Sequence, residues 1–95
     1  MVYLLHFDRP FQHVQHYVGY TEDTNFEQRI QRHKQGWSSS LMRAVNEAGI
    51  GFSVAKTWAG KGRDFERYLK GLKNAPQYCP HCGGTRVVRE PIMVF

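Results

Sequence analysis

The sequence lacks the features that would mark a membrane protein or a secreted disulfide-rich protein. No apolar run approaches the ~20 residues that a membrane-spanning helix needs, so we expect no membrane partner. The first residues, MVYLLHF, lack the basic region and the cleavage site of a signal peptide, which favours a cytoplasmic location. Only two cysteines are present, Cys79 and Cys82, and one pair is too few for a disulfide scaffold. Repeats and low-complexity tracts are also absent.

The composition is that of one small, basic globular domain. The 95 residues are 41% hydrophobic and 14% aromatic, which is too apolar for a disordered chain. The formal net charge is +5, and a basic domain suits a polyanionic partner because each bound phosphate releases a counterion. An ordinary solvated basic surface is the alternative interpretation.

Hydrophobic periodicity and chain breakers predict the elements in the order ββααβα. Strands are predicted over Val2–Phe7, Val14–Tyr20 and Ile50 to about Trp58, with a loop at Asp8–His13 and an added strand at Thr85–Val88. Helices are predicted from a Thr24–Glu27 capping box to about Gln35, where Gly36 ends the helix, from Ser38–Ser40 to Gly49, and around Phe65 to near Asn74. The order indicates an α+β fold with a small antiparallel sheet. We expect a domain over residues 1–76, with a Cys/Gly turn and tail over 77–95 packed on it or extending it.

Two of the predicted helices carry charged side chains where apolar ones are expected. Arg29 and His33 fall on the apolar side of the first helix, where a guanidinium is costly unless it is paired or lines a cleft. Glu66 falls at the edge of the apolar stripe of the third helix. The structural alternatives are a carboxylate partner for Arg29 and an i,i+4 pair between Glu66 and Lys70.

An ordered set of motifs runs through these elements. It consists of Tyr3 on the first strand, Tyr17-Val18-Gly19 on the second, Arg29-x-x-x-His33 on the first helix and Glu66 on the third. The set resembles the GIY-YIG nuclease superfamily over roughly residues 1–74. The resemblance implies a three-stranded antiparallel sheet flanked by three helices. It also implies a shared cleft, and a divalent metal, Mg²⁺ or Mn²⁺, held by one carboxylate and waters.

The resemblance assigns a role to each residue of the set, and each role is chemically sensible. Glu66 matches the metal-binding glutamate, and Mg²⁺ often takes only one or two carboxylates. Arg29 matches the arginine that grips the scissile phosphate with a forked pair of hydrogen bonds. Tyr17 is the candidate general base and needs a nearby cation, because a tyrosine with a pKa of ~10 is a poor base at pH 7. Tyr3 would orient the water or the phosphate, and His33 would tune the tyrosines or contact the phosphate.

The predicted activity is metal-dependent hydrolysis of phosphodiester bonds in DNA by an endonuclease. The alternative is a non-catalytic nucleic-acid-binding module, which zinc could stabilise. Basic and hydroxyl side chains outside the cleft are candidates for contacts with the DNA backbone: Lys34, Ser39, Arg43, Lys61 and Lys70. So small a domain has little room to read a sequence, and a homodimer or a larger protein partner could supply specificity.

The Cys79-Pro80-His81-Cys82 segment is open to three interpretations. A redox dithiol would need a helix N-terminus after the first cysteine, and here two glycines follow the pair instead. Half of a zinc site is the second, because such a turn is common in zinc ribbons, although tetrahedral zinc needs four ligands. The histidines that could complete the ligand set are His6, His13, His16 and His81. A structural turn with two free thiols is the third interpretation.

Overall fold

Three strands form one antiparallel sheet in the order β2-β1-β3, in a computed structural model that describes residues 1–35, 39–73 and 75–84. The strands are β1 (Val2–Phe11), β2 (Val14–Tyr20) and β3 (Phe52–Trp58). The helices are α1 (Phe26–Gln35), α2 (Ser40–Glu47), α3 (Arg63–Leu72) and α4 (Ala75–Tyr78). The predicted α+β class and the order ββααβα are confirmed, with α4 as a short addition to the three expected helices.

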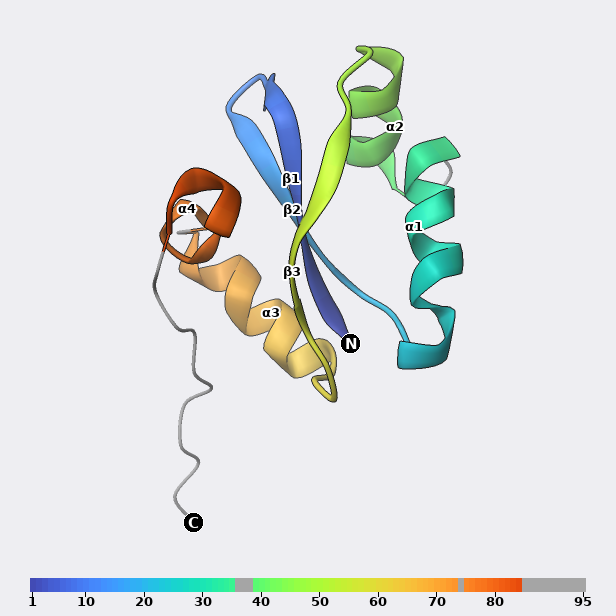
Figure 1. Ribbon diagram of the computed structural model, residues 1–95, viewed down its shortest axis with the longest axis vertical. Coiled ribbons are helices and arrows are strands. Elements are labelled where there is room, and N and C mark those ends of the chain that lie inside the picture. The colour runs from blue at the N-terminus through green and yellow to red at the C-terminus, as the bar shows by residue number, and fades with distance from the viewer. Residues whose placement is uncertain (36–38, 74, 85–95) are drawn as a thin grey trace.

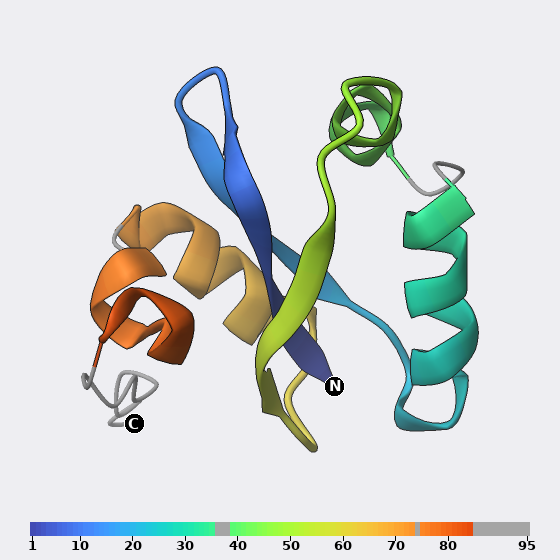
Figure 2. The ribbon, with the colours of Figure 1, turned by 45° about the horizontal axis from the view of Figure 1, so that its top comes forward.

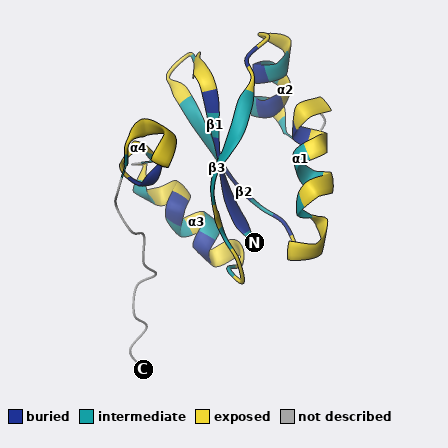
Figure 3. Cartoon of the chain, in the orientation of Figure 1, coloured by how far each residue is buried: buried dark blue, intermediate teal, exposed yellow. Residues whose placement is uncertain are grey.

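The sheet has a helical layer on each face, with α1 and α2 on one side and α3 and α4 on the other (Figures 1 and 2). Because side chains alternate along a strand, β1 supplies both cores. One core contains Val2, Leu4, Val18, Phe65, Leu69, Tyr78 and Cys79. The other contains Tyr3, Leu5, Phe7, Met42, Val45 and Ile50. Figure 3 shows the resulting pattern, in which buried residues concentrate along β1 and on the sheet-facing sides of the helices.

The predicted loop at Asp8–His13 is wrong over Asp8–Phe11 and right only at Gln12 and His13. Strand β1 continues to Phe11, and the hairpin turns at Gln12, whose φ is +56°. Pro10 argued against a strand because it cannot donate a ladder hydrogen bond. In the structure the pairing of β1 with β3 runs only to Phe7, and the register with β2 is irregular between His6 and Phe11. Pro10 therefore lies where a regular ladder is not maintained.

The start of α1 also differs from the expectation, whereas the limits of α2 agree with it. A hydrogen bond of 2.9 Å from the Asn25 N–H to the Glu22 carbonyl closes a 3-10 turn over Asp23–Asn25. Thr24 lies inside that turn instead of directly before the α-helix. The Ser39 hydroxyl caps α2 by accepting from the Met42 N–H at 3.2 Å, and the chain leaves α2 through Gly49 at φ +72°.

The last predicted elements are accounted for only in part. Helix α3 ends at Leu72, and Lys73 follows in the left-handed conformation. Pro76 lies in the first turn of α4, where its missing N–H leaves no bond unmade. Gly36, Asn74 and the predicted strand at Thr85–Val88 lie outside the described residues. In the part of the chain that is described, none of the helices has the length and apolar character needed to cross a bilayer.

Candidate active site

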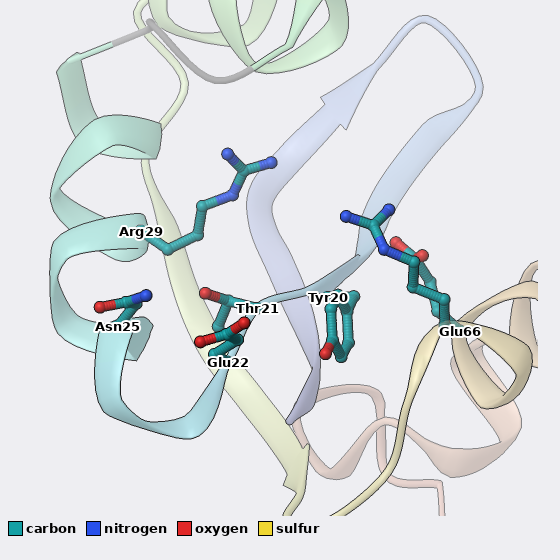
Figure 4. A pocket seen from close by; sticks show the side chains of 7 residues that line it. Tyr20, Thr21, Glu22, Asn25, Arg29 and Glu66 are labelled. Atoms are coloured by element: carbon teal, nitrogen blue, oxygen red, sulfur yellow. The ribbon is translucent and has the colours of Figure 1, made fainter.

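A pocket of about 300 Å³ opens at the end of β2, where the chain passes into α1. Its lining consists of Tyr20, Thr21, Glu22, Asn25, Arg29, Arg63 and Glu66. Figure 4 shows that Arg29 enters from α1 and Glu66 from α3, with Tyr20 of β2 between them. The pocket therefore lies at the β2 edge of the sheet, where the two helical layers meet. We call it the β2 pocket.

Beside this pocket lies a cluster made by the buried Tyr3 and His33 and the half-buried Tyr17 and Arg29, which we call the tyrosine–arginine cluster. The Tyr3 hydroxyl lies 2.5 Å from His33 Nε2, and both residues are fully buried. The Tyr17 ring centroid lies 5.1 Å from that of His33 and 6.4 Å from that of Tyr3. The Arg29 guanidinium makes hydrogen bonds to the side chains of both tyrosines. Four of the five predicted catalytic residues are thus in mutual contact.

Burial keeps Tyr3 and His33 uncharged. It raises the pKa of Tyr3 to about 12, against the opposing effect of a hydrogen bond from Arg29. It lowers the pKa of His33 to about 4, with the Arg29 charge acting in the same direction. Arg29 can only donate, so the Tyr3 oxygen accepts from it and the Tyr3 hydroxyl hydrogen can be donated to His33 Nε2. Arg29 then carries a positive charge beside the uncharged Tyr3 and His33.

Arg29 has one donor left over. Its Nε is buried and has no hydrogen-bond partner among the described residues. Because a buried unpaired donor is costly, a group that accepts a hydrogen bond from this atom would be bound favourably. Arg29 also lines the β2 pocket, so an anion in that pocket would have access to the guanidinium.

Glu66 is connected to the same cluster through Lys70. The Lys70 ammonium lies 3.4 Å from the Glu66 carboxylate and 5.8 Å from the centroid of the Tyr17 ring. The i,i+4 pair that was the structural alternative for Glu66 is therefore present. It does not remove Glu66 from the β2 pocket, whose lining includes this residue.

The close approach of Tyr3 to residue 19 explains why a glycine lies two residues after Tyr17. Gly19 is paired with Tyr3 across β1 and β2. A Cβ atom on Gly19 would overlap the ring and the hydroxyl oxygen of Tyr3. The absence of a side chain at residue 19 is what allows Tyr3 to lie against β2 and reach His33.

The residues predicted to contact the DNA backbone are spread over several elements. Lys34 is exposed near the end of α1, and the Ser39 hydroxyl is engaged as the cap of α2. Arg43 pairs with Glu47 at 3.3 Å, whereas the Lys61 ammonium lies 5.5 Å from the centroid of the Phe65 ring.

No family model, curated protein or solved structure matches this chain. The assignment to the GIY-YIG superfamily therefore remains a prediction from the ordered motifs. The geometry of the β2 pocket has to carry any functional argument by itself.

Sequence reasoning missed several residues of the β2 pocket. The Arg63 guanidinium lies 5.0 Å from the centroid of the Tyr20 ring, and both residues line the pocket. A detectable pattern existed for Arg63, because it precedes Glu66 by three residues and so shares its face of α3. Asn25 and Glu22 lie in the connection before α1, where no periodic pattern indicates which way a side chain points.

A second group of functional side chains lies elsewhere in the fold. The ligand atoms of His6, His16, Cys79 and Cys82 all lie within 4.8 Å of one another, and this group can hold a metal ion. Both cysteines are free thiols. Of the four histidines that could have completed the cysteine pair, the structure brings His6 and His16 to it. We call these four residues the His/Cys group.

Proposed function

We propose that the β2 pocket is the active site of a metal-dependent endonuclease that hydrolyses phosphodiester bonds in DNA, as in the GIY-YIG superfamily. One observation carries the proposal. Arg29 and Glu66 come from helices on opposite faces of the sheet, yet both line one pocket, and Arg29 also bonds Tyr3 and Tyr17. A phosphate clamp and a carboxylate thus share the pocket, and two phenols that do not line it are bonded to the clamp beside it. These are group types that this chemistry uses.

The pocket offers a phosphodiester two guanidinium groups, those of Arg29 and Arg63, and one of its two carboxylates, Glu66, already has Lys70 as a partner from outside the lining. Arg29 has a buried Nε that has no partner in the part of the chain that the structure describes, and Arg63 stacks on Tyr20 at the pocket wall. A guanidinium can bind two nonbridging oxygens at once and stabilise the charge that develops on them. The net charge of +5 favours the approach of DNA.

Glu66 is the residue that would hold Mg²⁺ or Mn²⁺. Its side chain is 17% exposed, and its partner Lys70 is 52% exposed, so the ammonium can move into solvent and release the carboxylate. One carboxylate is a sufficient protein ligand, because Mg²⁺ retains waters and binds substrate phosphates. When bound, the ion supplies Lewis-acid stabilisation of the leaving oxygen.

The two tyrosines take different roles. Tyr3, with a pKa of about 12 and a bond to His33, keeps its proton and acts by positioning. Tyr17 receives a hydrogen bond from Arg29 and faces the Lys70 ammonium, so positive charge approaches it from two sides. We assign Tyr17 as the group that takes the proton of the attacking water. The His/Cys group shares no residue with the pocket lining, so it supplies no ligand or proton donor to the pocket.

The Glu66–Lys70 ion pair favours one competing function. A carboxylate that stays paired would leave a pocket that binds phosphate without cutting it. The chain would then be a non-catalytic nucleic-acid-binding module. The two proposals differ in the role of Glu66, which a binder does not need and a nuclease does.

The test is a cleavage assay of the full chain on duplex, nicked, flap and branched DNA, each with Mg²⁺ or Mn²⁺. We expect cleavage by the wild type and a loss of rate of at least about 10²-fold in Glu66→Gln, with DNA affinity retained. Arg29→Lys keeps the charge but not the fork, and it should also lose at least about 10²-fold.

The matched control is Glu47→Gln. Like Glu66→Gln, it removes the carboxylate of an i,i+4 ion pair, here the exposed pair of Glu47 with Arg43. It should cleave as the wild type does. The proposal fails if the wild type cuts none of these substrates, or if Glu66→Gln cuts as fast as the wild type. DNA binding that is indifferent to both the metal and Glu66 would establish the binding module instead.

A further inference from the structure

The His/Cys group lies where the β1–β2 hairpin meets the C-terminal turn. His6 and His16 are opposite each other in the register of β1 and β2, which sets their rings side by side. Cys79 directly precedes the 3-10 turn Pro80–Cys82, and Cys82 is the last residue of that turn. Residues that are more than sixty positions apart in the sequence therefore converge on one point.

Four of the six distances within the group match the edges of a tetrahedron around one ion, and all six are within 4.8 Å. His6 Nδ1 lies 3.3 Å from His16 Nε2, 3.6 Å from Cys79 Sγ and 3.5 Å from Cys82 Sγ. Cys82 Sγ lies 3.4 Å from His16 Nε2. Zinc bonds of ~2.0–2.1 Å to nitrogen and ~2.3 Å to sulfur give tetrahedral edges of about 3.4 Å between nitrogens and about 3.6 Å between nitrogen and sulfur.

Hydrogen bonds alone do not explain this packing. A ring nitrogen of histidine carries either one hydrogen or one lone pair in the ring plane, so it makes one good hydrogen bond. His6 Nδ1 has three neighbours at 3.3 to 3.6 Å. A single central metal ion satisfies all four ligand atoms at once, because each atom then directs a lone pair at that ion.

We propose that the His/Cys group binds one zinc ion in a closed Cys₂His₂ site. Thiolate and imidazole ligands select zinc over Mg²⁺, which prefers oxygen. Four protein ligands leave no coordination position for water or substrate, so the site is structural and not catalytic. Zinc also neutralises the charge of the two thiolates. That matters because Cys79 is fully buried in the core with Val2 and Leu4.

The turn that carries the cysteines is built to hold both sulfurs on one side. The Cys79 carbonyl accepts from the N–H groups of Cys82 at 3.1 Å and Gly84 at 2.9 Å. Gly83 has φ +77°, and a Cβ on Gly84 would overlap the backbone of Pro76 and Gln77. The two glycines after Cys82 are therefore required by the backbone of the turn.

The ion would fasten the end of the domain to its sheet. His6 and His16 belong to the hairpin, and the cysteines belong to the segment that follows α3. Cys79 is buried in the core, whereas Pro80, His81 and Cys82 are exposed, and His81 Nδ1 lies 3.1 Å from the Ser53 hydroxyl. The expected consequence is a large loss of stability when zinc is removed, because binding to the folded state alone stabilises it.

The experiment uses the full chain purified with a tag that contains no histidine. Elemental analysis should find one zinc per chain in the wild type. It should also find one zinc per chain in each of two controls, His13→Ala in the hairpin turn and His81→Ala between the two cysteines. His16→Ala and Cys82→Ala should lose the zinc during gel filtration. A chelator should lower the melting temperature of the wild type by about 15 °C or more.

A spectroscopic measurement keeps the test decisive where a variant fails to fold. Metal-free wild-type chain titrated with Co²⁺ should show the intense visible bands of a tetrahedral site and a thiolate-to-metal band in the near ultraviolet. The proposal is overturned by zinc-free protein whose melting ignores the chelator, by weak octahedral Co²⁺ bands, or by a Cys79–Cys82 disulfide in the purified chain. It is also overturned if zinc survives His16→Ala but not His81→Ala. None of these measurements depends on cleavage of DNA.

Discussion

At the scale of single residues, the tyrosine–arginine cluster depends on two side chains that stay uncharged, Tyr3 and His33. His33 has no exposed surface, and an imidazolium there would lie beside the Arg29 guanidinium. A neutral imidazole instead provides an acceptor for the Tyr3 hydroxyl at 2.5 Å. The cluster is therefore stable only while His33 stays unprotonated, which makes the stability of the fold depend on pH.

We predict that His33→Gln weakens the dependence of stability on acid. The pKa of His33 is lowered from 6.5 to about 4, so as the pH falls from 6.5 toward 4 the unfolded chain binds a proton that the folded chain refuses. This stabilisation is present above the unfolded pKa and is lost as the pH falls. The loss between about pH 7.5 and about pH 5 amounts to about 2 kcal/mol.

Urea denaturation of the wild type and of His33→Gln at both pH values measures the difference. Glutamine can still accept from Tyr3 but does not titrate. His13→Gln, at an exposed position, should follow the wild type. The account of His33 is wrong if His33→Gln loses as much stability on acidification as the wild type does.

At the scale of elements, periodicity predicted most of what the structure shows. The strand at Val14–Tyr20 and the end of α1 at Gln35 agree with the expectation, because alternation and helical stripes reflect burial directly. The helical wheel also placed Arg29 and His33 on the inner side of α1. The errors at Pro10 and Thr24 came from local rules. Each rule was overridden by a feature that a single segment does not reveal, namely irregular strand pairing and a 3-10 turn.

We predict opposite effects for two glycine substitutions in different elements. Gly19→Ala should destabilise the domain by about 1–3 kcal/mol, because its Cβ overlaps the buried Tyr3 ring between β1 and β2. Gly71→Ala, at an exposed position of α3 with nothing within 4 Å of the added atom, should stabilise it by about 0.5–1 kcal/mol.

Urea denaturation of both variants checks the signs. Gly19→Ala should also move the Tyr3 ring away from His33, which the chemical shifts of the imidazole would report. Equal stability of Gly19→Ala and the wild type would mean that Tyr3 is not confined by β2 as described.

At the scale of the whole molecule, the sequence motifs identified candidates but not the contacts among them. Cys79 and Cys82 were visible as a metal-ligand pair, yet four histidines could have joined them. The choice of His6 and His16 follows from the hairpin register and from the return of the chain to the sheet after α3. Likewise, no local pattern shows that Arg29 and Glu66 share a pocket, because the sheet that brings them together is assembled from distant segments.

The return of the chain to the sheet after α3 also places residues beyond the expected domain boundary at residue 76 in the core. Tyr78 and Cys79 are buried in the core that contains Val2 and Leu4, and the Tyr78 ring centroid lies 5.9 Å from that of Trp58. A chain ending at residue 76 would leave this part of the sheet uncovered. Loss of a large buried aromatic side chain costs about 3–5 kcal/mol, which is a large share of the ~5–15 kcal/mol that stabilises a typical domain.

We therefore predict that the fragment 1–76 is not cooperatively folded at 25 °C, whereas the full chain is. Its circular dichroism should lack a sharp thermal transition, and its amide protons should exchange rapidly. Tyr78→Phe in the full chain keeps the ring and is the control, which should lose no more than about 2 kcal/mol. If the fragment 1–76 melted at the temperature of the full chain, the turn that carries Cys79 would be an appendage and not a part of the core.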